Sequence, residues 1–185
     1  KRRQAYALLD SGSNRDVVDR EVVMELGGVT TKALMTISTV SGEVTEIKEL
    51  LDIRVESIDG SFWVDARDAI VGGRITCDDD RLPSAADVAQ FPHLQGVQFS
   101  DLQASIVLIL CVKHAYTWTG CNSRPGSASS PTAVETKWGW ALFGSRGCKR
   151  AARRASVFHV QASRLDKLEE SLRRIQAQGF SDYSV

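Results

Sequence analysis

Two alternating runs joined by Asp59-Gly60 constrain the fold of this chain more than any other feature. Positions 51, 53 and 55 are apolar in the first run, and a second β-prone run extends from Phe62 to Val71. Asp-Gly favours a tight hairpin turn, because both central residues of that turn need positive φ. The sequence therefore predicts a β-hairpin over residues 50–71.

Other segments also have the pattern of strands. Leu34–Val40 and Glu43–Ile47 flank a Ser41-Gly42 turn, which predicts a second hairpin. The continuous apolar run Ile106–Val112 is typical of a strand that is buried on both faces. The remaining expected elements are a strand at Gln4–Leu9, a strand at Thr136–Phe143 and an exposed loop at Asn122–Pro131.

Two segments have helical spacing. Asn14–Leu26 is compatible with a short helix ending at Gly27-Gly28, although its valines are poor helix formers. Arg164–Gln178 carries leucines at helical spacing with charges between them, which predicts an amphipathic helix ending at Gly179. We interpret the second helix as an appendage to the main domain.

Composition argues against several classes of function. The 23 basic and 23 acidic residues balance, so net charge does not indicate a nucleic-acid-binding protein. The longest apolar run is too short to span a bilayer, and no signal peptide follows the basic residues 1–3. The acidic run 78–80 favours a solvated loop over a metal site. The four cysteines form neither a C-x-x-C pair nor a Cys/His cluster, so we expect no metal, no cofactor and free thiols in a reducing, cytoplasmic compartment: Cys77, Cys111, Cys121 and Cys148.

The segment Ala7–Ser13 places Asp10 where an apolar strand runs into small residues. A carboxylate at the end of a buried strand is costly unless it is paired or hydrogen-bonded. Two interpretations remain open for this segment. Asp10 is either a catalytic carboxylate on a turn, or part of an Asx-turn in which it accepts a backbone N–H and Gly12 adopts positive φ.

Several other chemistries lack their motifs. Gly12-Ser13 does not fit the Gly-x-Ser-x-Gly nucleophile elbow, and no phosphate-binding or dinucleotide-binding glycine pattern is present. The histidines His93, His114 and His159 are widely separated and have no evident nucleophile partner, so we expect structural roles for them. By elimination, the carboxylate on the turn is the best candidate for chemistry.

Asp-Ser-Gly after an apolar strand is the active-site signature of aspartic peptidases. Two aspartates lie close enough to share one proton, because both cannot ionise side by side. The ionised carboxylate draws a proton from a water, and the protonated one donates to the substrate carbonyl. This chain has one copy of the signature, which predicts a symmetric homodimer with the site on the two-fold axis.

Three segments, in this order, form a more specific pattern: Ala7–Ser13, Phe91–Val97 and Thr136–Gly144. The second reads aromatic-Pro-His-Leu-x-Gly-aliphatic, and the third reads Thr-x-x-Gly-Trp-x-aliphatic-x-Gly. In these segments the chain resembles the retropepsin-like peptidase of BEL/Pao-type LTR retrotransposon polyproteins, and the likeness covers most of the chain. The helix from Arg164 onward resembles the connector that leads toward the reverse transcriptase.

The resemblance implies a mainly β, closed-barrel acid-protease fold for residues 1–144 and an endopeptidase that cuts its own polyprotein. Asp10 would supply one half of the dyad. Ser11 would brace the partner loop across the dimer, Gly12 would allow close approach, and Ser13 would hydrogen-bond the Asp10 carboxylate.

The second hairpin would be the flap, with Val40, Ser41 and Gly42 closing over an extended peptide that pairs its backbone with the enzyme. Residues 145–185 would form a basic linker and the amphipathic helix leading to the next polyprotein domain.

Two departures from the family keep alternatives open. Cys111 stands where the family has glycine after two apolar residues, and few residues precede Ala7, so we expect a domain truncated at its N-terminus. One alternative is a catalytically inactive remnant that acts as an interaction or dimerisation module. Another is a nucleic-acid-associated module that uses the basic run 146–154.

Overall fold

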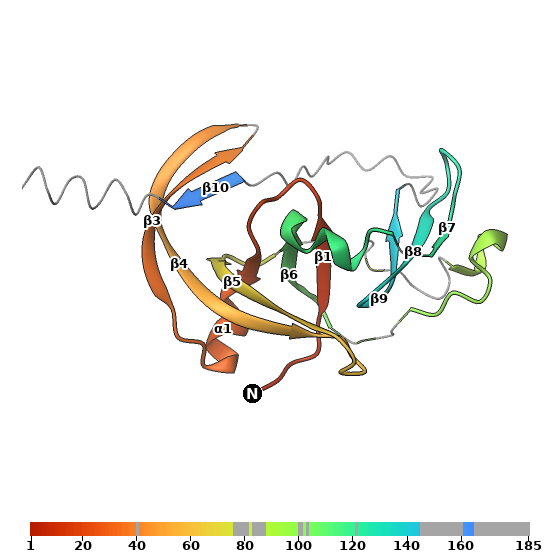
Figure 1. Cartoon of the computed structure of the whole chain (residues 1–185), viewed down its shortest axis with the longest axis horizontal. Coiled ribbons are helices and arrows are strands. Elements are labelled where there is room, and N and C mark those ends of the chain that lie inside the picture. Colours follow the sequence, from red (N-terminus) through yellow and green to blue (C-terminus); the bar gives the residue numbers. More distant parts are fainter. Residues whose placement is uncertain are drawn as a thin grey trace, which may run out of the picture.

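The computed structural model describes residues 1–39, 41–75, 82, 88–99, 102, 104–120 and 122–144, and the backbone of residues 161–164. These residues form a mainly β protein with two sheets (Figure 1). The seven-stranded sheet has the spatial order β1 (Tyr6–Asp10), β6 (Ile106–Cys111), β2 (Val17–Asp19), β5 (Trp63–Gly72), β4 (Gly42–Glu56), β3 (Thr31–Thr39) and β10 (Gln161–Arg164). The three-stranded sheet has the order β7 (Ser123–Arg124), β8 (Thr132–Thr136) and β9 (Gly139–Phe143). The described residues also include the helix α1 (Arg20–Leu26) and the 3-10 helices η2 (Pro92–Leu94) and η3 (Val112–Thr117).

Neither sheet closes on itself, so the prediction of a closed barrel is wrong. In the part of the chain that the structure describes, β1 lies at one edge of the large sheet and β10 lies at the other. A barrel needs its two edge strands to pair with one another. Here β1 pairs with β6 and β10 pairs with β3, and the long curved hairpin of β3 and β4 separates them (Figure 1).

Both predicted hairpins are confirmed. In the β4–β5 hairpin, Gly60 has φ of 71°, and Asp59 accepts hydrogen bonds from the Ser57 hydroxyl and the Ser61 backbone N–H. These bonds, the one from Ser57 first, lower the pKa of Asp59 to about 2. In the β3–β4 hairpin, Thr39 and Gly42 are the last paired residues, and Val40 between them lies outside the described residues.

The strand β6 is the centre of the fold and confirms the prediction of a strand buried on both faces. All six of its residues are buried, and it pairs with β1 in parallel and with β2 in antiparallel orientation. The helix expected over residues 14–26 is therefore only partly correct. Val17 and Val18 form β2 between β6 and β5, because β-branched side chains pack well in a sheet interior.

The helix α1 begins after β2 and has a cap at each end. The Asp19 side chain accepts a hydrogen bond from the Glu21 backbone N–H at 2.8 Å, as N-cap aspartates do. Gly27 ends the helix in the left-handed region, with φ of 72°, as its position in the sequence predicted.

The second sheet corrects two expectations. The strand expected over residues 136–143 is a hairpin of β8 and β9, because Thr136 and Gly139 pair across a turn and Gly139 has φ of 106°. The loop expected over residues 122–131 contains the short exposed strand β7. Trp140 and Leu142 from β9 pack against the cluster that contains Leu94 from η2, so two of the three segments that carry the family resemblance lie together.

Several sequence predictions concern residues outside the described part of the chain. They are the acidic run 78–80, the basic run 146–154, His159, the cysteines Cys77, Cys121 and Cys148, and the C-terminal helix after Arg164. Arg164 itself ends β10, which pairs with β3 in antiparallel orientation.

Burial in the large sheet gives a direct test of the fold. Val18 is 1% exposed and Val29 is 88% exposed, so the same substitution meets opposite environments. We expect Val18→Ala to lower the free energy of unfolding by roughly 2 kcal/mol, through lost burial and a residual cavity. Val29→Ala should change it by less than about 0.5 kcal/mol. Urea denaturation measures both, and equal losses in the two variants would contradict the placement of β2 in the core.

Candidate active site

Asp10 is the last residue of β1, at the edge of the large sheet. Its register partner in β6 is Cys111, so the turn after β1 begins beside the end of the buried central strand. In Figure 1 this turn and the tip of the β3–β4 hairpin lie at the same upper end of the molecule. The sheet therefore places the sequence-predicted carboxylate and the predicted flap on one side.

The two carboxylate oxygens of Asp10 have different surroundings. Oδ1 accepts a hydrogen bond from the Gly12 backbone N–H at 2.9 Å. Oδ2 is shielded from solvent and has no hydrogen-bond partner among the described residues. A buried polar atom without a partner costs about 1–3 kcal/mol, so native structures contain few of them.

The geometry agrees in part with the Asx-turn interpretation of this segment. Asp10 makes the Asx-turn hydrogen bond to Gly12, but Gly12 is absent from the residues with positive φ, so that part of the expectation is wrong. The Asx-turn uses one oxygen and leaves the other available. Asp10 is therefore a turn residue that also presents an unsatisfied carboxylate oxygen.

The two serines of the turn differ in exposure. Ser11 is exposed, whereas Ser13 is 2% exposed. The Ser13 hydroxyl donates to the Arg15 carbonyl at 2.8 Å and accepts from the Arg15 N–H at 3.2 Å. Ser13 thus holds the turn from within, and Ser11 faces outward beside the carboxylate.

A buried aspartate that sequence reasoning missed ties this turn to the central strand. Asp16 is 2% exposed, and its Oδ1 accepts from the Cys111 backbone N–H at 2.9 Å. Its Oδ2 lies 2.9 Å from His114 Nε2 on η3. The Val112 N–H also donates to the Ser13 carbonyl at 3.0 Å. These bonds fix the loop that follows Asp10 against the end of β6.

The prediction that no Cys/His cluster is present is wrong, because Cys111 and His114 lie together with Asp16. One weak signal in the sequence indicated this arrangement. His114 lies three residues after Cys111, which places both on one side of a helical turn. The partner Asp16 is distant in sequence and comes near only through the pairing of β2 with β6. His93 has the structural role that we expected, because its Nε2 lies 2.8 Å from the Pro131 carbonyl oxygen.

Cys111 is a buried free thiol beside Asp10. Burial raises its pKa from 9.0 to about 11, and the neighbouring Asp16 carboxylate adds to the shift. Asp16, Cys111 and His114 together present three side chains of metal-ligating type, with one ligand atom from each lying within 4.8 Å of the others.

The predicted flap is a regular two-stranded ribbon. Its strands are joined by side-chain bonds, including Thr36 to Thr45 and Ser38 to Glu43. At the tip, the Ser41 backbone N–H donates to the Thr39 hydroxyl at 3.1 Å. Val44 and Ile47 expose 57% and 67% of their surface on this hairpin. Because side chains alternate along a strand, each face of the hairpin carries one of these exposed apolar side chains.

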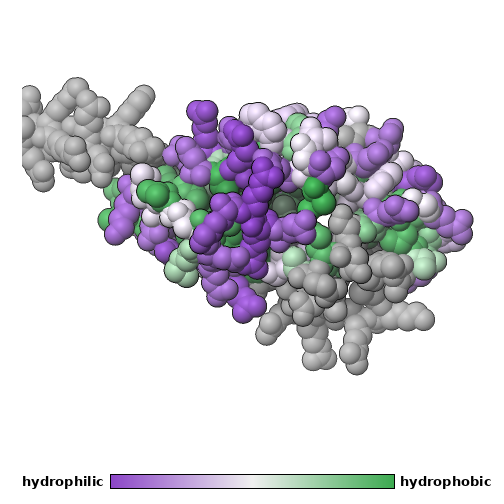
Figure 2. All heavy atoms as spheres, turned by 90° about the horizontal axis from the view of Figure 1, so that it is seen from below, coloured by the Kyte–Doolittle hydropathy of each residue, from purple (hydrophilic) through white to green (hydrophobic). Residues whose placement is uncertain are grey.

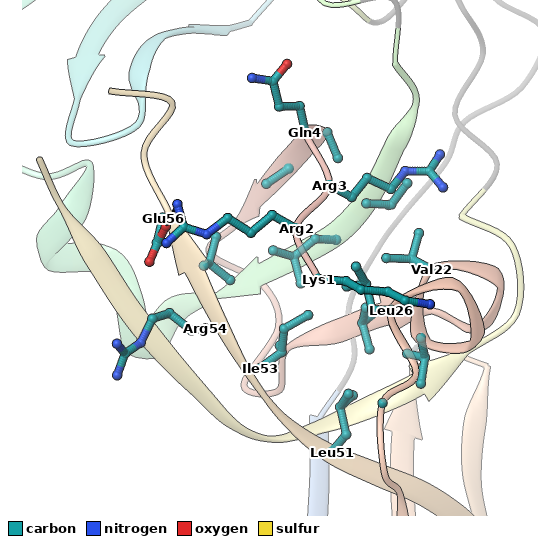
Figure 3. A pocket seen from close by; sticks show the side chains of 18 of the residues that line it. Lys1, Arg2, Arg3, Gln4, Val22, Leu26, Leu51, Ile53, Arg54 and Glu56 are labelled. Atoms are coloured by element: carbon teal, nitrogen blue, oxygen red, sulfur yellow. Dashed lines mark ion pairs between the residues drawn. The ribbon is translucent and has the colours of Figure 1, made fainter. Parts of the chain in front are cut away.

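A cavity of about 630 Å³ lies away from Asp10, beneath the N-terminal segment. Figure 3 shows Lys1, Arg2 and Arg3 above apolar side chains of α1 and β4. From below, hydrophilic side chains lie beside a hollow with apolar atoms (Figure 2). The positive charges of two arginines at its rim are balanced by ion pairs, because Arg2 pairs with Glu56 and Arg3 pairs with Glu25. Asp10 is not among the lining residues, so this cavity is not the candidate active site.

Comparisons of this chain with protein-family models, with curated proteins and with solved structures found no match. Among the described residues, no helix has the length and apolar character required to cross a membrane.

The pKa of Cys111 predicts a specific pH dependence of stability. The native thiol keeps its proton up to about pH 11, whereas the unfolded thiol loses it near 9.0. The native state thus binds more protons between these values, and the free energy of unfolding falls as pH rises through this window. The expected loss is on the order of 2 kcal/mol.

Urea denaturation at several pH values in chelating buffer measures this loss. Cys111→Ala removes the titrating thiol, so its stability should fall less steeply than that of the parent above pH 9.0. Parallel pH profiles for the two proteins would contradict the assignment.

Proposed function

We propose that this chain is one half of an aspartic endopeptidase, which is completed by a second copy across a two-fold axis. The observation that supports the proposal is the Asp10 carboxylate, with one oxygen bound to the Gly12 N–H and the other buried without a partner among the described residues. A buried oxygen without a hydrogen bond is costly, so it requires a group that the described residues do not supply. In an acid dyad, that group is the carboxyl of the partner's aspartate together with the shared proton.

The rigid surroundings of Asp10 favour a catalytic role. The bonds from Cys111 and His114 to Asp16, and from Val112 to the Ser13 carbonyl, hold the loop after Asp10. A carboxylate that is fixed before substrate binds needs little reorganisation during reaction. Ser11 is exposed beside it, where its hydroxyl is available to the same loop of a second copy.

The proposed reaction is hydrolysis of a peptide bond by a water that the dyad activates. The ionised aspartate removes a proton from the water, and the protonated aspartate donates to the peptide carbonyl. No covalent intermediate with the enzyme forms. The family resemblance implies that the substrate is a polyprotein. It also implies that residues 40–42 form the tip of the flap.

The edge of the flap hairpin supports an extended substrate. The backbone of Gln161–Arg164 pairs with Met35–Ser38 of β3, so this edge accepts an extended segment as an added strand. Peptide recognition by strand addition takes its affinity from such main-chain hydrogen bonds.

A second candidate is a catalytically inactive retropepsin-like remnant that serves as an interaction or dimerisation module. The observation that favours it is Cys111, a buried side chain beside Asp10 where the resembled family has glycine. A nucleic-acid-associated role for the basic run 146–154 remains a prediction from the sequence alone.

Replacement of the carboxylate separates the two candidates. We expect Asp10→Asn to lower cleavage of an extended apolar peptide at mildly acidic pH by roughly 10²–10⁴-fold, because an amide is neither acid nor base. The fold should survive, since the Asn carbonyl oxygen still accepts from Gly12. Peptide cleavage followed by mass spectrometry measures the loss.

The matched control is Asp65→Asn, which makes the same chemical change at an exposed ion pair with Arg54. Surface pairs of this kind contribute little, so this variant should cleave as the parent does. Equal cleavage by Asp10→Asn and the parent would contradict the proposal that the Asp10 carboxylate activates the water. A folded parent without any cleavage would favour the remnant.

Mixing experiments test whether two chains share the dyad. When parent and Asp10→Asn are mixed in equal amounts and allowed to exchange, only parent–parent dimers carry two carboxylates. Activity should then fall to about one quarter of the parent value, rather than the one half expected of independent sites. Sedimentation velocity on the same samples reports the dimer, and a chain that stays monomeric at high concentration would contradict the shared site.

A further inference from the structure

Asp16, Cys111 and His114 form a buried group of three different metal-ligating side chains. Their exposed fractions are 2%, 0% and 8%, and one ligand atom from each lies within 4.8 Å of the other two. We propose that this group is a structural zinc site that ties the loop after Asp10 to the central strand. The proposal is independent of the peptidase activity, because Asp10 does not belong to the group.

The donor set favours zinc over other divalent cations. Cysteine sulfur, histidine nitrogen and carboxylate oxygen are the three ligand types that Zn²⁺ uses in proteins. Thiolate and imidazole do not suit Mg²⁺ or Ca²⁺, which take oxygen ligands. One divalent cation also balances the two negative charges of a thiolate and a carboxylate, so the loaded site adds no net charge to the interior.

Three separate elements place the ligands before the ion arrives. Cys111 ends β6, His114 lies on η3 three residues later, and Asp16 comes from the loop before β2. The Cys111 backbone N–H holds Asp16 Oδ1 at 2.9 Å, which leaves Oδ2 directed at His114 Nε2. These contacts already hold the Asp16 carboxylate and the His114 imidazole next to one another, so binding requires only small side-chain adjustments.

Binding exchanges protons for the metal ion. Binding through His114 Nε2 requires the imidazole tautomer with its proton on Nδ1, so Nε2 releases to the buffer any proton that it shares with Asp16 Oδ2 and Nδ1 takes one up. The Cys111 thiol also gives its proton to the buffer, and the neutral imidazole and the thiolate then bind the ion. In the described part of the chain, no fourth Cys, His, Asp or Glu belongs to the group. A water or a backbone carbonyl would therefore complete the tetrahedron.

Cobalt serves as the spectroscopic probe for this site. The full-length chain is stripped with a chelator and titrated with Co²⁺ alone. We expect saturation at one equivalent, with a near-ultraviolet sulfur-to-cobalt charge-transfer band that disappears when Zn²⁺ is added. Absence of the band at saturating Co²⁺ would overturn the proposal.

Two histidine variants test whether the cobalt ion that gives this band is bound by His114. His114→Gln should weaken Co²⁺ binding by more than roughly a hundredfold, because loss of a ligand exceeds the effect of losing an outer-shell partner. His93→Gln changes a histidine that contacts the Pro131 carbonyl and the Phe91 ring and does not belong to the group, so it should bind Co²⁺ as the parent does. Equal binding by the parent and His114→Gln would refute the assignment.

X-ray absorption of the zinc-loaded parent provides a test that needs no variant to fold. The expected result is one sulfur ligand at about 2.3 Å, with nitrogen or oxygen in the other positions. Two or more sulfur ligands would place the metal at other cysteines and overturn the proposal. A spectrum without any sulfur ligand would also overturn it.

Discussion

The pairing of β6 with β1 and β2 is the constraint on which the rest of the structure depends. All six residues of β6 are buried, so the strand has no face on which a polar neighbour is tolerated without a hydrogen bond. Its parallel partner β1 ends at Asp10, and its antiparallel partner β2 begins after Asp16. The loop between these two strands must therefore lie over the end of β6, whatever its own sequence prefers.

Hydrogen bonds to Asp16 hold the loop between β1 and β2 in one conformation. A buried carboxylate is destabilising without partners, and here it has two, the Cys111 N–H and His114. The same contacts set the environment of the Cys111 thiol, because burial beside a carboxylate disfavours the thiolate. These contacts consequently stabilise the loop after Asp10, while Asp10 Oδ2 is buried without a hydrogen-bond partner in the part of the chain that the structure describes.

Local patterns in the sequence predicted much of the sheet and little of the site. The β3–β4 and β4–β5 hairpins were predicted correctly, because turn chemistry and alternation act over a few residues. The tight turn expected at Asp59-Gly60 was wrong in detail, since Gly60 has positive φ and Asp59 does not. The helix expected at residue 14 was wrong at its start, since tertiary pairing of Val17 and Val18 with β5 and β6 overrides helical spacing. The closed barrel was also wrong, because closure depends on which edges meet.

The sequence by itself determined that the chain is mainly β, that a strand ends at Asp10, and that its Asp-Ser-Gly occurs once. These are properties of short segments, so propensity, alternation and motif spacing suffice to identify them. Only the tertiary structure decided that Asp16 and His114 meet and that one oxygen of Asp10 is buried without a partner among the described residues. Residues nearly one hundred positions apart become neighbours through strand pairing, and no local pattern encodes that pairing.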